Sequence, residues 1–293
     1  MPTAIDVAIR FDDPSVASDH ALERALLSAM QTHNIRATFA VVPRISQQSL
    51  HQGSVPHLVE AHQAGRIEIA QHGFNHENHD LNAALPSEFS GLGHAAQWSK
   101  IVDGRCLLEK VFGRAPSGFI PPFNTFDHNT AGILSDLGFR YLSAGSEHGI
   151  IRTNQLALLP RTCQMSELTR AVTEARRRPN GRLVILAVLH HYDFKEFGNT
   201  DAPFTLKSLS RLLHWLSQQT DVRVNTLSEL AEKHSIETWR KAVERFRWVQ
   251  RQHWRVRACF PNHCLMLRSL INYPRRVASM LAFDFSDDTP SPT

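Results

Sequence analysis

The feature that most constrains this fold is a regular alternation of short apolar strands with amphipathic helices. Residues 4–11 alternate apolar with polar or small side chains, as a half-buried strand does, and helical periodicity follows over residues 19–33. The predicted strands are 4–11, 37–43, 66–70, 117–120, 139–143, 183–189 and 222–226, and the predicted helices are 19–33, 55–63, 95–112, 130–137, 166–177, 206–218 and 227–234. Such an alternation predicts right-handed βαβ crossovers and a mostly parallel sheet.

The composition is that of an ordinary globular protein. With 293 residues, of which 42% are hydrophobic and 20% charged, the chain has enough material for one barrel-sized domain and an extension. Four cysteines form no dense framework, which favours a reducing compartment. The first residues show no basic segment followed by an apolar core, and the longest apolar runs are only as long as strands. We therefore expect a cytoplasmic protein without a membrane span.

Potential metal ligands follow two of the predicted strands. Asp12 and Asp13 end the first, while His72 and His76 follow the strand over 66–70. Because the carboxyl ends of parallel strands meet at one edge of a sheet, we expect these side chains to converge. A catalytic zinc needs about three N or O ligands and leaves a position for water. The two histidines and one aspartate satisfy that number, and the second aspartate is suited to act as a base.

Simpler explanations exist for each motif taken alone. Asp-Asp-Pro is common turn chemistry, and an HxxxH arises easily by chance in a chain with 17 histidines. The polar stretch over 77–93 predicts a surface loop able to form a lid.

Taken together and in this order, the motifs resemble the polysaccharide deacetylases of the NodB-homology type, carbohydrate esterase family 4, over roughly residues 1–232. The resemblance implies an α/β fold, an irregular (β/α)7 barrel. It also implies that Asp12 is the general base and that Asp13, His72 and His76 hold a divalent metal. Zinc is the expected ion, with cobalt and manganese as alternatives.

Two further segments carry the resemblance. Pro121-Pro122-Phe123-Asn124 resembles the family turn that lines the substrate groove, which implies that Pro122, Phe123 and Asn124 bind substrate and that the Phe123 amide meets the oxyanion. The aliphatic run 183–189 precedes two histidines and resembles the strand that ends in the general acid. We expect His190 in that role, with His191 as the alternative.

The chain departs from the family pattern at two places. Ile120 stands where the family has an arginine. Arg10 is expected to replace that charge, because residues i and i+2 of a strand lie on the same face and Arg10 is therefore a neighbour of Asp12. Alternatively, Arg10 is a structural ion-pair partner of Asp6 or Asp12. The family's Asp-Trp pair, which orients the catalytic histidine, has no recognisable counterpart near 141–147. Asp193 is a candidate for orienting the histidine, for binding sugar hydroxyls, or for starting a helix.

The C-terminal part differs in charge from the rest. Residues 239–277 contain ten Lys or Arg and one acid, a net +9, against −5 for the remainder of the chain. Aromatic residues are interleaved with these cations, namely Trp239, Phe246, Trp248 and Trp254. Basic aromatic segments favour anionic membrane surfaces. The alternative is a helix that docks on the barrel or on a second subunit and buries its tryptophans; nucleic acid is disfavoured because no binding motif accompanies the charge.

These observations predict three parts and one function. The parts are a deacetylase-like barrel over 1–235, a basic aromatic helical extension over 236–283 and a disordered tail over 284–293. We expect a metal-dependent hydrolase that removes an N-acyl group, most simply acetyl, from a sugar of a bacterial surface polysaccharide or its precursor, inside the cell and at the inner face of the membrane. The alternatives are another amide hydrolase on the same fold, a deformylase or an allantoinase-like enzyme, and a carbohydrate-binding protein without turnover.

Overall fold

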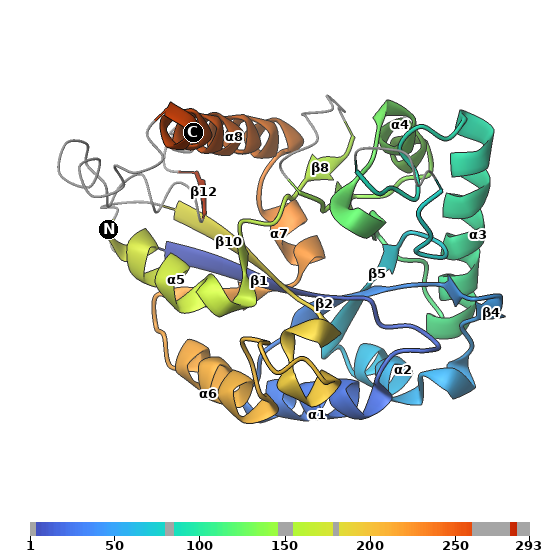
Figure 1. Ribbon diagram of the computed structural model, residues 1–293, viewed down its shortest axis with the longest axis horizontal. Helices are drawn as coiled ribbons and strands as arrows, with labels where there is room; N and C mark the ends of the chain where they lie inside the picture. The colour runs from blue at the N-terminus through green and yellow to red at the C-terminus, as the bar shows by residue number, and fades with distance from the viewer. Residues whose placement is uncertain (1–3, 80–84, 146–154, 178–181, 260–281, 286–293) are drawn as a thin grey trace, which may run out of the picture.

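In a computed structural model, the chain is described over residues 4–79, 85–145, 155–177, 182–259 and 282–285, with the backbone alone over 249–259. A curled sheet forms the centre, with helices packed around it (Figure 1). The strands of this sheet are β1 Ala4–Asp12, β2 Ala37–Val41, β5 Ile67–His72, β6 Gly118–Ile120, β7 Tyr141–Leu142, β8 Ala157–Leu158, β9 Cys163–Gln164, β10 Arg182–Leu189, β11 Val222–Asn225 and β12 Phe283–Asp284. A separate hairpin pairs β3 Arg44–Ile45 with β4 Gln48–Ser49. The helices are α1 His20–Thr32, α2 Pro56–Gln63, α3 His94–Phe112, α4 His128–Asp136, α5 Leu168–Arg176, α6 Leu206–Ser217, α7 Leu227–Lys233 and α8 Ile236–Cys259.

The sheet has the topology of a parallel α/β barrel. Its strand order is β12-β10-β1-β2-β5-β6-β7-β8, and β12 alone among the described strands of this sheet runs antiparallel to its neighbour. The first strand, β1, pairs with β10 along one edge and with β11 and then β2 along the other. After β8 the chain reaches the opposite end of the strand order, where the Thr162 N–H donates to the Leu186 carbonyl on β10. The predicted fold class is therefore confirmed, and every strand and helix predicted from periodicity is present.

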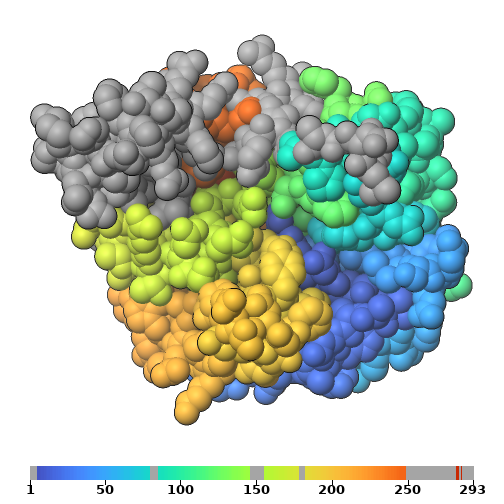
Figure 2. Space-filling view, viewed as in Figure 1, coloured from blue at the N-terminus to red at the C-terminus, as the bar shows by residue number. Residues whose placement is uncertain are grey.

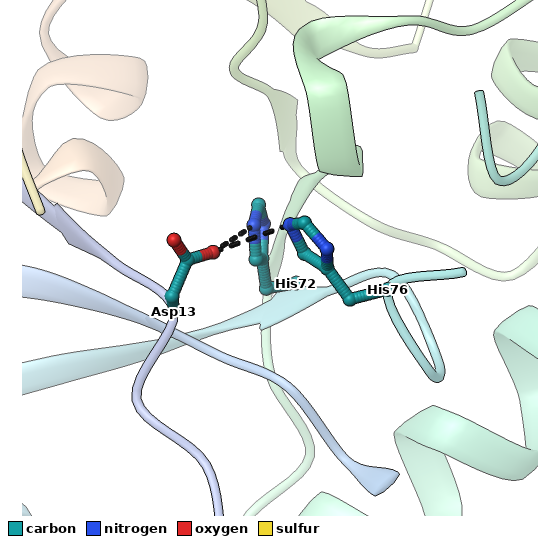
Figure 3. A group of neighbouring side chains, drawn as sticks. All are labelled: Asp13, His72 and His76. Atoms are coloured by element: carbon teal, nitrogen blue, oxygen red, sulfur yellow. Dashed lines mark ion pairs between the residues drawn. The ribbon is translucent and has the colours of Figure 1, made fainter. Parts of the chain in front are cut away.

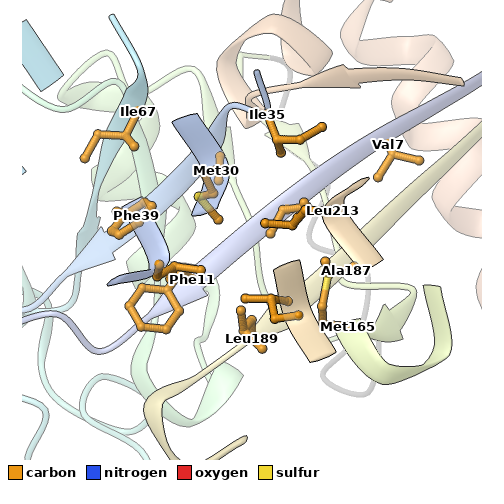
Figure 4. Close-up of a cluster of buried hydrophobic side chains, with 14 of the residues drawn as sticks. Val7, Phe11, Met30, Ile35, Phe39, Ile67, Met165, Ala187, Leu189 and Leu213 are labelled. Atoms are coloured by element: carbon orange, nitrogen blue, oxygen red, sulfur yellow. The ribbon is translucent and has the colours of Figure 1, made fainter. Parts of the chain in front are cut away.

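Alternation along β1 divides the structure into an outer and an inner layer. The odd-numbered residues Val7 and Phe11 belong to a buried cluster that packs beneath α1 and α6 with Met30, Phe39 and Leu213 (Figure 4). The even-numbered residues of β1 face the interior of the curled sheet instead. The same two-residue period that predicts the strand thus also places Arg10 and Asp12 inside the barrel.

Helix α7 closes one end of the barrel. Its Leu227 N–H donates to Thr38 Oγ1 at 2.9 Å, and its Ser228 N–H donates to Glu68 Oε2 at 3.1 Å. Thr38 and Glu68 lie at the starts of β2 and β5, so the helix N-terminus meets the strands at their amino ends. The carboxyl ends of the strands remain for the polar residues that the sequence places there.

Helix α8 docks on the barrel along its first turns. Trp239 and Phe246 are buried against Phe283 and Phe285, with ring centroids of Trp239 and Phe285 4.9 Å apart. Trp248, by contrast, is 58% exposed. At the first two positions of the tail predicted over 284–293, Asp284 pairs with β10 and Phe285 is buried. The side chain of Trp254 and residues 286–293 lie outside what is described. No helix in the described part is long and apolar enough to cross a membrane.

Candidate active site

Three potential metal ligands converge at the carboxyl ends of the strands (Figure 3). Asp13 follows β1, His72 ends β5, and His76 lies on the loop after β5. Asp13 Oδ1 is 3.0 Å from His72 Nε2 and 3.3 Å from His76 Nε2, and the three ligand atoms all lie within 4.8 Å of one another. The structure therefore brings together the three residues that the sequence suggests as a metal triad.

Left-handed backbone turns make this convergence possible. Continued strand geometry would point Asp12 and Asp13 to opposite faces, but Asp13 has φ 75°. His76 also adopts a left-handed conformation, with φ 55°. Such conformations cost roughly 1–2 kcal/mol for residues with a Cβ, and they concentrate at functional sites because the surrounding structure enforces them.

The donor set fits a divalent cation. His72 Nδ1 lies 2.9 Å from the Ile120 carbonyl, and a ring that donates its Nδ1–H there leaves Nε2 as the nitrogen that faces Asp13. Burial alone would raise the pKa of Asp13, but its hydrogen bonds and charge interactions with His72 and His76 hold that pKa well below the usual range. Burial would lower the pKa of His76, but contact with the Asp13 carboxylate outweighs it and raises that pKa. A carboxylate faced by two imidazoles is the N and O donor set that zinc prefers.

Asp12 is held by a buried arginine beside this triad. Arg10 Nη2 donates to Asp12 Oδ2 at 2.7 Å and to Asn124 Oδ1 at 3.0 Å, and neither Arg10 nor Asp12 is more than 1% exposed. Arg10 Nη1 donates to the Ser143 hydroxyl at 3.0 Å. The expected proximity of Arg10 to Asp12 is confirmed. Asp6, the other expected partner of Arg10, accepts instead from Lys233 and Asn225.

The two adjacent histidines after β10 point to different environments. His190 Nε2 lies 3.6 Å from Asp12 Oδ2, and Asp193 Oδ2 lies 3.5 Å from His190 Nδ1. Asp193 also accepts the backbone N–H of His190 at 2.8 Å. The ring of His191 instead packs on the outer side of the strand, where its Nε2 is 3.0 Å from Glu23 Oε1. Only His190, of this pair, faces Asp12.

The turn after β6 borders the same site. The Phe123 ring centroid lies 4.7 Å from that of His76, and both Phe123 and Asn124 have positive φ, 58° and 56°. Pro122 precedes them at the start of the turn and is buried. These residues therefore lie beside the predicted metal triad, and their contact with a substrate stays a prediction.

The ring of Tyr192 lies next to His190 and is partly exposed to solvent. The segment after β10, gold in Figure 2, lies near the centre of the face shown there. Tyr192 is 51% exposed, and its ring stacks on that of His190 with centroids 4.5 Å apart. Burial and the nearby carboxylates of Asp193, Asp13 and Asp12 raise the pKa of Tyr192 above its usual value, so its hydroxyl keeps its proton at neutral pH.

Sequence reasoning missed Glu88. The described residues of the loop predicted over 77–93 form a loop, but Glu88 and Phe89 within it are completely buried. The Glu88 carboxylate accepts hydrogen bonds from the backbone of the loop that carries His76. No local pattern marks this residue, since a single Glu-Phe pair within a polar stretch carries no periodicity.

The comparisons with known proteins agree with this geometry. Residues 2–142 match the family model described as polysaccharide deacetylase. This first part of the chain is similar to the polysaccharide deacetylase family. No curated protein sequence matches it significantly. The match supports deacetylase activity on a sugar.

Solved structures share the fold of this chain. A putative polysaccharide deacetylase from Mycobacterium smegmatis is 19% identical, with a TM-score of 0.57 over 79% of this chain and 90% of that chain. A probable polysaccharide deacetylase from Pseudomonas aeruginosa PAO1 is 14% identical, with a TM-score of 0.55 over 78% and 90%. The PuuE allantoinase is 13% identical, with a TM-score of 0.53 over 78% and 89%. At these identities the likeness establishes the barrel fold and leaves the substrate undetermined.

Proposed function

We propose that this chain is a metal-dependent hydrolase that removes an N-acyl group, most simply acetyl, from a sugar. The observation that carries the proposal is the convergence of Asp13, His72 and His76 beside Asp12 and His190. A triad able to hold a cation thus lies beside a candidate base, Asp12, and a candidate acid, His190.

Zinc is the proposed metal, held by Asp13 and the Nε2 atoms of His72 and His76. Cobalt and manganese are alternatives, because N and O ligands also accept them. When bound, such a cation supplies a Lewis acid that polarises the acyl carbonyl and lowers the pKa of water.

The proton transfers are assigned to Asp12 and His190. Arg10 occupies Asp12 Oδ2, whereas Asp12 Oδ1 is buried without a hydrogen-bond partner in the described part of the chain and is available to accept the proton of the attacking water. His190 Nε2 approaches Asp12 Oδ2, the oxygen that Arg10 also contacts, and would donate a proton to the departing amine. Asp193 would orient the His190 ring and so take the place of the family's missing aspartate. The backbone N–H of Phe123 would donate to the oxyanion.

We further propose that the substrate is a sugar of a bacterial surface polysaccharide or its precursor. Phe123 and the half-exposed ring of Tyr192 offer apolar faces on which a sugar ring can stack. The basic stretch over 239–277 would hold the enzyme at an anionic membrane surface, in keeping with a cytoplasmic enzyme at the inner face, or against a second subunit.

A second candidate is an amide hydrolase that acts on a non-sugar substrate. It is favoured by the shared fold of the PuuE allantoinase and by Ile120, which stands where sugar deacetylases carry an arginine. The released product distinguishes the two, since a deacetylase releases acetate, a deformylase formate, and an allantoinase-like enzyme opens a ring without releasing either.

The test combines metal content with product release. We expect about one zinc per chain in the wild type, its loss in His72→Ala, and its retention in His128→Ala, an exposed histidine on α4 that serves as the control. Acetate release from N-acetylated sugars should follow the zinc content. A wild-type chain that binds no divalent metal would exclude the proposed mechanism and favour a carbohydrate-binding protein without turnover.

A further inference from the structure

We propose that Glu88 is a positioning residue of the metal centre, which holds the loop carrying His76 in the geometry of a ligand. This inference rests on the proposed function, because it assumes that His76 binds the metal. Glu88 is not a ligand itself, since both of its oxygens are engaged by the protein.

The carboxylate of Glu88 binds three consecutive backbone amides. Its Oε1 accepts from the N–H groups of Phe74 at 3.0 Å and Asn75 at 3.1 Å, and its Oε2 accepts from the N–H of His76 at 3.1 Å. The side chain is completely buried, where each of these charge-assisted bonds is stronger than in water. A single carboxylate therefore fixes the backbone of His76 and of the two residues before it.

The charge of Glu88 is balanced from α3. Lys100 Nζ lies 3.2 Å from Glu88 Oε1 and donates to the Asn75 side-chain oxygen at 2.7 Å. A buried carboxylate is stable only when it is paired and its lone pairs are satisfied. With three amides and one ammonium, Glu88 meets both conditions, so the loop is connected to a rigid helix.

The position before the three amides must be glycine. Gly73 has φ +61°, and a Cβ built there would lie 2.3 Å from Glu88 Oε2 and 2.6 Å from Pro122. The carboxylate thus occupies the space that a side chain would fill. The same spot links the His76 loop to the turn that carries Phe123.

This arrangement has a specific consequence for His76. Its φ of 55° is unfavourable for a residue with a Cβ, so the loop needs an external hold to keep that conformation. The bond from the His76 N–H to Glu88 Oε2 supplies the hold at the ligand itself. Loss of that bond alone should loosen His76 and leave Asp13 and His72 in place.

Glu88→Gln isolates this bond. The amide keeps the size of the side chain but presents one oxygen and one NH₂. If the oxygen faces Phe74, Asn75 and Lys100, the NH₂ opposes the N–H of His76, a donor against a donor. Outer-shell changes of this kind weaken metal binding by about 10- to 100-fold, and we expect that loss for zinc, measured by competition with a chromophoric chelator.

Glu68→Gln is the matched control. Glu68 lies on the same strand as His72 but at its amino end, and it accepts bonds from Thr38, Tyr141 and Ser228. Both variants are expected to lower the melting temperature of the metal-free protein. Only Glu88→Gln should weaken zinc binding and alter the visible absorption spectrum of the cobalt-loaded protein, which reports the geometry of the ligands.

The outcomes separate this inference from the proposed function. A wild type that binds zinc, with Glu88→Gln binding it equally well, overturns the positioning role and leaves the function intact. A wild type that binds no metal overturns both. If the Glu88→Gln variant does not fold, Lys100→Gln takes its place in the experiment, because this substitution removes the balancing charge and one bond to Asn75. Weaker zinc binding by Lys100→Gln supports the positioning role of Glu88, and unchanged zinc binding overturns that role.

Discussion

Replacement of Arg10 by methionine tests the buried charge arrangement at the centre of the site. Methionine keeps the unbranched stem and removes the guanidinium, which leaves Asp12 without its cation and Asn124 Oδ1 without a donor. Breaking a fully buried ion pair by removing one partner costs about 3–5 kcal/mol, and both side chains here are at most 2% exposed. At roughly 2–4 °C per kcal/mol for chains near this size, we expect the melting temperature to fall by roughly 10 °C.

The control is an exposed pair of the same kind. Arg36 lies 2.7 Å from Glu229, but the two side chains are 46% and 34% exposed, so solvent screens the pair and Arg36→Met should cost about 0–1 kcal/mol. Both variants are compared by urea unfolding of chelator-treated protein at neutral pH, so that metal binding does not contribute to the free energy of unfolding.

A double variant decides whether the loss comes from the unpaired charge. Arg10→Met with Asp12→Asn removes both charges, and contacting residues show coupling of about 0.5–3 kcal/mol. We expect the double variant to be less destabilised than the sum of the two single variants by an amount in that range. Additive effects, or an Arg10→Met cost no larger than that of Arg36→Met, would refute this account of the site.

Three other outcomes follow from the structure. Burial would raise the pKa of Glu23, but its bonds with His191, His57 and Ser18 lower that pKa from 4.5 to about 2. At about 1.4 kcal/mol per pKa unit, the ionised carboxylate contributes about 3 kcal/mol to the free energy of unfolding above pH 4.5. This contribution is lost as the pH falls toward 2. The difference in unfolding free energy between wild type and Glu23→Gln should shrink accordingly, and an equal difference at pH 3 and pH 7 would contradict it. Trp239 is buried and Trp248 is exposed. In urea unfolding, Trp239→Ala should therefore lower the free energy of unfolding by about 3–5 kcal/mol and Trp248→Ala by at most about 0.5 kcal/mol. Equal losses would argue against the docking of α8. In acetate-release assays His190→Ala should lower kcat by about 10²- to 10⁴-fold, while His191→Ala should mainly lower stability, and the reverse pattern would exchange their roles.

Local patterns in the sequence were enough to predict the main elements and the residues at their ends. The two-residue period over 4–11 depends only on neighbouring side chains, so it places Arg10 and Asp12 on one face before any tertiary contact is known. The order of the motifs likewise predicts that Asp13, His72 and His76 meet, because the carboxyl ends of parallel strands share an edge.

Other features depend on segments that are far apart in the chain. The short strands β8 and β9 have too few residues to show a period, and they pair only because β7 and β10 lie beside them. The docking of Trp239 depends on Phe285, which is distant in sequence.

At the site, strand periodicity and motif order are local properties, and they are enough to predict which residue types gather. The tertiary structure sets their geometry. It turned Asp13 through a left-handed backbone toward the histidines, selected His190 rather than His191 to face Asp12, and brought Glu88 beneath the His76 loop. The physical reason is that a buried polar group must find its partners in space, and those partners come from whichever segments the fold makes adjacent.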